Sequence, residues 1–166
     1  MKTKTKPATI TESMKFDGDI IITDPCYVIN KKTSGRIDYN DKEAWAALGV
    51  KNCMARDTIY GDWGCTVFDT DDGQVIGEFC ADSGMVAVFL LDEILKYNPE
   101  FDYHINRKWT TTLIKDFNGL VQFVVEEEKY EYDGKECTDY SVHVVGHGVD
   151  KNTGEPKNFR STQTGL

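Results

Sequence analysis

The chain has 166 residues, of which 40% are hydrophobic and 28% charged, a balance that fits one compact globular domain and excludes a fibrous or disordered chain. Its formal net charge of −9 disfavours non-specific binding to nucleic-acid phosphates or anionic lipid, and it suits a partner protein with a basic surface. No apolar run approaches the roughly 20 residues of a membrane-spanning helix.

The cysteines and the first residues indicate a compartment. The five cysteines are an odd number and form no C-x-x-C pair, and no apolar segment follows Met1, so we expect a reducing cytoplasm without structural disulfides. Residues 1–12 are polar and carry three lysines. We therefore expect a flexible basic N-terminus over residues 1–12, followed by one β-rich domain over residues 13–166.

The first elements are read from short apolar runs and their boundaries. Residues 20–23 form a β-branched run that ends at Asp24-Pro25, where proline removes a ladder donor, so a strand followed by a turn is expected. Asn40 or Asp41 can cap a short helix that ends at Gly49.

The middle of the chain changes to a period of two. Residues 65–69 and 74–80 flank an Asp71-Asp72-Gly73 turn, which predicts a β-hairpin. Residues 85–90 are apolar on both faces and indicate a central strand. Apolar residues at helical spacing follow from Leu91, and Asn98-Pro99 should end that short helix.

The second half repeats this pattern. Strands are expected at residues 110–115 and 120–127 around an Asn118-Gly119 turn, and at residues 129–132 and 137–145 around Asp133-Gly134. A loop over residues 150–157 precedes a last edge strand that begins at Asn158. The expected fold is an antiparallel sandwich or partly open barrel of about eight strands with two short α-helices, with an α+β fold as the alternative.

Two groups of possible metal ligands do not have the spacing of a metal site. Counting from Asp69, the glycine and glutamate of a calcium loop fall out of register, so the carboxylates of Asp69, Asp71 and Asp72 read as a solvated turn. His143 and His147 lie on an expected strand, where four residues span roughly 13 Å. No cofactor motif is present, and we expect neither metal nor cofactor.

Cys26 follows the first turn and is a possible nucleophile, which would need an imidazole from His104, His143 or His147. Burial as a small apolar residue is the alternative for Cys26. Asp82 and Ser83 precede the most apolar strand without matching a serine-hydrolase motif, and they read as turn caps. Aromatic residues around Gly61 form either a binding platform or part of the core.

Three segments, ITDPCY at residues 22–27, GDWGCTV at residues 61–67 and CADSGMV at residues 80–86, carry a resemblance. Together they resemble an uncharacterised family of small proteins from bacteriophages and bacterial mobile elements, which share a D-P-C-Y turn, a G-D-G-like segment and a D-S-G before an apolar strand. The resemblance covers residues 18–95 and the closing residues 162–166. Trp63 stands where that family has glycine. The resemblance implies a phage source and a bacterial host cell, and it implies no particular activity.

The favoured hypothesis is a non-enzymatic phage-type binding protein that acts stoichiometrically on a host protein and inhibits a bacterial defence component. One alternative is a protein that sequesters a small nucleotide signal between aromatic rings and Arg56 or Arg107; another is a cysteine-dependent hydrolase. Unpaired edge strands also allow a homo-oligomer. The residues expected to bind are Asp24, Cys26, Tyr27, Tyr60, Asp62, Trp63, Asp69, Asp71, Asp72, Asp82 and Ser83.

Overall fold

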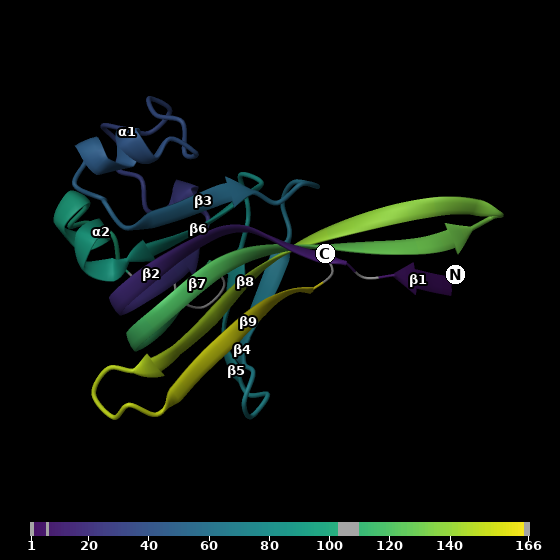
Figure 1. Ribbon diagram of the computed structural model, residues 1–166. Coiled ribbons are helices and arrows are strands. Elements are labelled where there is room, and N and C mark those ends of the chain that lie inside the picture. The colour runs from purple at the N-terminus through teal and green to yellow at the C-terminus, as the bar shows by residue number, and fades with distance from the viewer. Residues whose placement is uncertain (1, 6, 103–109, 165–166) are drawn as a thin grey trace.

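The computed structural model describes residues 2–5, 7–102 and 110–164 (Figure 1). Its strands are β1 Lys2–Thr5, β2 Ala8–Thr23, β3 Cys53–Asp57, β4 Gly64–Asp69, β5 Val75–Cys80, β6 Met85–Leu90, β7 Thr111–Tyr132, β8 Lys135–Asp150 and β9 Pro156–Thr164. The helical elements are a 3₁₀ turn, η1, at Pro25–Tyr27 and two α-helices, α1 Lys42–Ala47 and α2 Leu91–Tyr97. No helix within these described ranges is long and apolar enough to cross a membrane.

All described strands belong to one antiparallel sheet in the order β3-β6-β2-β7-β8-β9-β4-β5, and β1 pairs separately with β7. The sheet curls into a half-barrel, so the expected β-rich antiparallel fold with two short α-helices is confirmed (Figure 1). Thr112 Oγ1 donates a hydrogen bond of 3.0 Å to the Glu78 carbonyl, which joins β7 to β5 across the curl. The concave side holds the main apolar core, in which Phe16, Phe123 and Phe159 are buried.

A second apolar cluster lies between the helices and strands β2, β3 and β6. Trp45 of α1 and Ile94 of α2 are fully buried against Ile21 and Phe89. Asp41 caps α1 by accepting from the backbone N–H groups of Glu43 and Ala44, which decides between the two expected caps, Asn40 and Asp41. The helices therefore cover the sheet face that the half-barrel does not enclose.

The turn expected at Asn118-Gly119 is wrong, because β7 runs without interruption from Thr111 to Tyr132. Both residues pair with β2 on one side and with β8 on the other. A Cβ atom at Gly119 would lie 2.3 Å from the His147 carbonyl oxygen. Glycine is required here because two backbones approach closely, and the two flanking strands outweigh the local turn preference.

Two other boundaries differ from the expectation. The N-terminal segment expected to be flexible contains β1 and the start of β2, because residues 8–10 pair with residues 124–126 of β7. The last strand, β9, is not an edge strand, since β8 pairs on one side of it and β4 on the other. In both places pairing with distant strands decided the structure.

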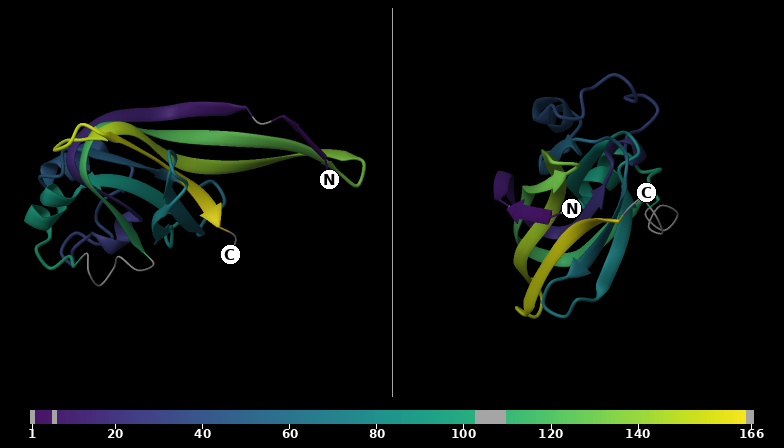
Figure 2. Two further views of the ribbon diagram at one scale, coloured as in Figure 1. Left: turned by 90° about the horizontal axis from the view of Figure 1, so that it is seen from below. Right: turned by 90° about the vertical axis from the view of Figure 1, so that its right-hand side faces the viewer.

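The outer part of the β7–β8 hairpin projects from the body of the molecule, with β1 beside it (Figure 1 and Figure 2). We call residues 126–140 the arm. Asp133 and Gly134 form its turn with positive φ angles of 52° and 72°, so this expected hairpin is confirmed. The arm places its side chains away from the main core.

Candidate functional site

The end of β2 is closed by a buried carboxylate. Asp24 is fully buried and caps η1 by accepting from the Cys26 N–H at 2.9 Å. The neighbouring Thr23 hydroxyl contacts Thr111 Oγ1 at 3.0 Å and donates to the Thr110 carbonyl at 3.1 Å. The turn after β2 is thus held by polar contacts to β7.

The three segments that carry the sequence resemblance meet at this end of the half-barrel. Ser83 donates from its backbone N–H and its hydroxyl to Asp24, and the Tyr27 hydroxyl donates to the Asp82 carboxylate. Thr58 donates to the carbonyls of Gly61 and Gly84, and the Ala81 N–H donates to the Trp63 carbonyl at 2.9 Å. These contacts pack the loops that contain the three segments against one another. The polar residues of the segments therefore have a structural role at this junction.

Cys26 lies in this junction as a half-buried thiol. Burial first, and then the nearby Asp24 carboxylate, raise its thiol pKa to about 12. A reactive cysteine needs a lowered pKa and a neighbouring base. The junction therefore favours the neutral thiol over the thiolate that a nucleophile requires.

Tyr60 stands on a strained turn above the junction. Ile59 has a positive φ of 74°, which is rare for a β-branched residue, and the Tyr60 N–H donates to the Thr58 carbonyl at 2.9 Å across it. Tyr60 is 55% exposed, whereas Trp63 is only 4% exposed. Trp63 therefore belongs to the core and supports Tyr60 in an edge-on contact, with ring centroids 6.3 Å apart.

Tyr60 also reaches the arm. Its hydroxyl accepts a hydrogen bond of 3.1 Å from the Tyr140 N–H, and the two rings lie 6.5 Å apart between centroids. A cavity of about 340 Å³ opens here, lined by Tyr60, Asp139, Tyr140 and Gln163. The sequence pointed to Tyr60 alone, since its cavity partners are 79 or more positions away in the chain.

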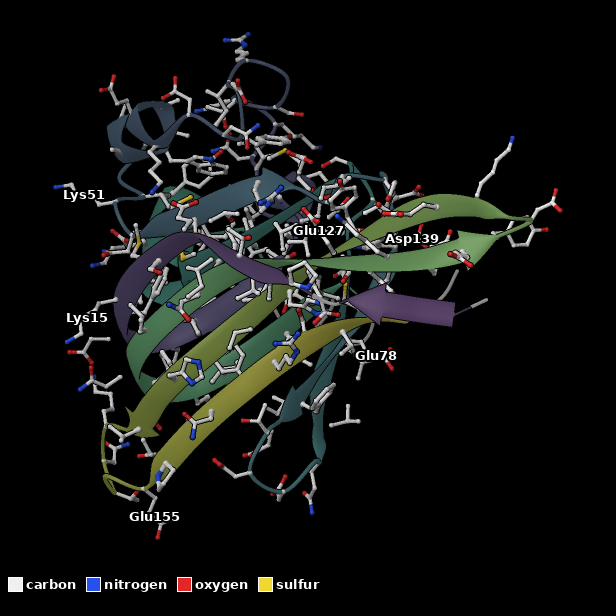
Figure 3. All side chains as sticks on the ribbon, turned by 45° about the vertical axis from the view of Figure 1, so that its right-hand side comes forward. Lys15, Lys51, Glu78, Glu127, Asp139 and Glu155 are labelled. Atoms are coloured by element: carbon white, nitrogen blue, oxygen red, sulfur yellow. The ribbon has the colours of Figure 1, made fainter. Side chains whose placement is uncertain are left out.

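The arm is strongly acidic. Residues 126–140 contain seven carboxylates and two lysines, a formal charge of −5, and the Lys2 and Lys4 residues of β1 bring the combined charge to −3. Glu127 and Asp139 lie on the arm, while Lys15 and Lys51 lie at the opposite side of the body (Figure 3). The density of acidic and tyrosine residues around Asp133-Gly134 is the sequence signal that could have identified the arm.

The acidic turn between β4 and β5 lies elsewhere. Asp69 accepts from the Asp71 and Asp72 N–H groups at 2.7 and 3.2 Å, and Asp72 accepts from the Gln74 N–H at 2.8 Å. Asp71 accepts from the Asn158 side-chain amide. These carboxylates cap the hairpin turn. The expected binding residues are therefore divided between this turn and the loop junction. Asp62 is exposed and adjacent to Trp63 in the chain.

His143 is a buried histidine whose two ring nitrogens both form hydrogen bonds. Its Nδ1 donates to the Ser161 carbonyl at 2.7 Å, and its Nε2 contacts Ser141 Oγ at 2.9 Å. Burial lowers the pKa of His143, and the Arg160 guanidinium lowers it further against the opposing effect of the Ser161 carbonyl. The neutral imidazole thus accepts from the serine, and it ties β8 to β9.

Arg56, which the nucleotide alternative requires, does not line this cavity. Arg56 donates to Thr11 Oγ1 and to the Asp57 carbonyl, and Arg107 and His104 lie outside the described residues. Among the described residues, no group of three or more His, Cys, Asp or Glu side chains could hold a metal ion.

Comparison of the chain with known protein families, with curated proteins and with solved structures finds no match.

Proposed function

We propose that this protein is a non-enzymatic binding protein that acts stoichiometrically on a partner protein with a basic surface. The carrying observation is the arm, a projecting acidic hairpin with an aromatic cavity at its base. Acidic surfaces of this kind steer encounter with a basic partner, and rigid aromatic side chains supply contact area at little cost in conformational entropy. The loop junction then serves as the support that holds the arm and Tyr60 in position.

The resemblance to small phage proteins extends the proposal to its setting. A phage protein meets its partner in the cytoplasm of the bacterial host, so we propose a host protein as the partner, and more narrowly a component of a bacterial defence system. This extension rests on the three sequence segments alone. Binding through the arm is the part that the described contacts support.

The test compares two charge-reversed variants. Glu127→Lys with Asp133→Lys changes the arm by four charges, and Glu43→Lys with Glu155→Lys makes the same change at exposed positions of the body. Immobilised wild-type protein should retain a bacterial protein in near equimolar amount, and the purified retained protein should rebind. The arm variant should lose this retention, and the body variant should keep it.

Salt gives the second readout of the same experiment. Charge-steered association is screened beyond a Debye length of roughly 8 Å at physiological ionic strength, so the association rate should fall as salt rises. Equal retention by both charge-reversed variants, or association that does not respond to salt, contradicts the proposal.

A second candidate function has one observation in its favour. A cavity of about 530 Å³ is lined by Lys31, Lys32 and Tyr97 together with Asn30, Asn98, Pro99 and Glu100. Two ammonium groups beside a tyrosine ring suit a small anionic ligand with an aromatic ring, such as a nucleotide. Calorimetric titration with a set of nucleotides tests this candidate, and Lys31→Ala with Lys32→Ala should abolish any binding that is found.

A further inference from the structure

The cavity at the base of the arm combines two aromatic rings with a carboxylate. Tyr60 and Tyr140 present rings tilted by 45° to each other, and Asp139 and Gln163 complete the lining. No lysine or arginine is among the four residues that line this cavity. Aromatic faces and a carboxylate without a cation of their own form the kind of site that attracts a cation.

The ring of Tyr60 is held in place before any partner arrives. Its hydroxyl is fixed by the Tyr140 N–H, and its ring rests on the buried Trp63. Tyr60 nevertheless remains 55% exposed, so one ring surface is available for contact. A preordered, exposed aromatic ring is the usual form of an energetic anchor at a protein interface.

Asp139 is likewise held by its neighbours. The Tyr130 hydroxyl hydrogen-bonds to the Asp139 carboxylate, and the pKa of Tyr130 is raised by desolvation and by this negative charge. Asp139 lies on the arm, where it pairs with Glu128 of β7 (Figure 3). The surrounding acidic residues add attraction for a cation at longer range.

We propose that this cavity binds the guanidinium group of an arginine side chain on the partner, which packs on the Tyr60 ring and pairs with the Asp139 carboxylate. A guanidinium is planar, stacks on aromatic faces and presents donors in a fork that matches a carboxylate, whereas an ammonium is compact and strongly hydrated. Gln163 offers a further acceptor through its amide oxygen. This inference rests on the proposed function only for the source of the arginine.

The experiment titrates the whole protein with N-acetyl-L-arginine amide and follows the Tyr140 backbone amide and the Gln163 side-chain amide by NMR. The citrulline analogue is the matched ligand, because it keeps the shape of arginine without its charge. The lysine analogue distinguishes a guanidinium site from a general cation site. We expect saturable shifts with arginine and binding of lysine that is about threefold to tenfold weaker.

Variants test the assigned residues. Asp139→Asn should weaken arginine binding about threefold to tenfold, and Tyr60→Leu should do the same. Asp92→Asn, at an exposed aspartate of α2, and Tyr132→Leu, at an exposed tyrosine near the arm tip, should leave it unchanged. Should Tyr60→Leu lower the melting temperature, Asp139→Asn decides alone, since it changes an exposed side chain.

The outcomes separate the two proposals. Equal shifts with arginine and citrulline, equal binding of lysine, or arginine binding that Asp139→Asn does not weaken each overturn the cavity assignment. Partner retention by the charge-reversed arm variant overturns the proposed function and is measured independently of the arginine titration. Loss of retention in that variant together with an absent arginine shift leaves the arm as the binding surface and removes the cavity from it.

Discussion

Ser83 lies 59 residues after Asp24, and both its backbone N–H and its hydroxyl donate to the Asp24 carboxylate, the N–H at 2.6 Å and the hydroxyl at 2.7 Å to the nearer oxygen. Asp24 is fully buried, so these bonds and the one from the Cys26 N–H replace its hydration. The relationship joins two of the segments that carry the sequence resemblance and accounts for their residue types in structural terms.

Removing the Ser83 hydroxyl should destabilise the protein. Ser83→Ala takes one donor from a buried carboxylate, and the expected loss in the free energy of unfolding is about 1.5–3 kcal/mol. Urea unfolding measures this loss, and Asp82→Asn at the exposed neighbouring position is the control, with a smaller expected change. An unchanged free energy of unfolding in Ser83→Ala would show that the contact to Asp24 is not formed.

Cys26→Ser should keep both stability and partner binding. The thiol is held neutral by a pKa of about 12, so a hydroxyl of similar size can take its place. Iodoacetamide should label Cys26 slowly at pH 8, because little thiolate is present. Rapid labelling, or a large loss of activity in Cys26→Ser at an unchanged melting temperature, would instead support the cysteine-hydrolase hypothesis.

Replacing Ile59 by glycine should relieve backbone strain. A positive φ disfavours an L-residue by roughly 1–2 kcal/mol, and glycine loses part of this gain through the entropy of the unfolded chain. We expect Ile59→Gly to raise the free energy of unfolding by up to about 1 kcal/mol. Ile76→Gly, at another exposed isoleucine within β5, should lower it. A loss of stability in both variants would contradict the strain at Ile59.

His143 should make the stability depend on pH. Burial first, and then Arg160, hold its pKa in the folded protein below the ordinary value of 6.5, so the unfolded chain binds the proton more readily. The stabilisation is complete above pH 6.5 and is lost as the pH falls through that value toward the lower pKa of the folded state. His143→Gln should flatten this part of the profile, and His147→Gln, at an exposed histidine, should not. Identical profiles in the two variants would contradict this assignment.

Local patterns predicted the elements whose ends are set locally. The Asp41 cap of α1, the Asp71-Asp72-Gly73 turn and the Asp133-Gly134 turn are each decided by a few neighbouring residues, and the structure confirms all three. Asn118-Gly119 has the same turn signal but lies between two long strands, where pairing on both sides keeps β7 extended. At such a position, hydrogen bonding to two neighbouring strands outweighs the local turn propensity of the residues.

The candidate site could be anticipated only in part. Tyr60 was predicted from its aromatic neighbourhood, but Trp63 is in the core and the other lining residues come from β8 and β9. The register of β8 and the place where β9 leaves it bring Asp139, Tyr140 and Gln163 together, and neither can be read from a local pattern. The density of acidic residues around Asp133-Gly134 is the local signal that could have identified the arm, and the expected binding residues do not include it.

The most direct measurement of the central claim is a titration of the purified partner's activity with this protein. A stoichiometric binding protein gives an effect that reaches a plateau near one equivalent, because each molecule occupies one partner. We expect this plateau for the wild-type protein and its displacement to higher ratios for the charge-reversed arm variant. Complete and time-dependent loss of partner activity at about one-hundredth of an equivalent would require turnover, which would contradict stoichiometric binding.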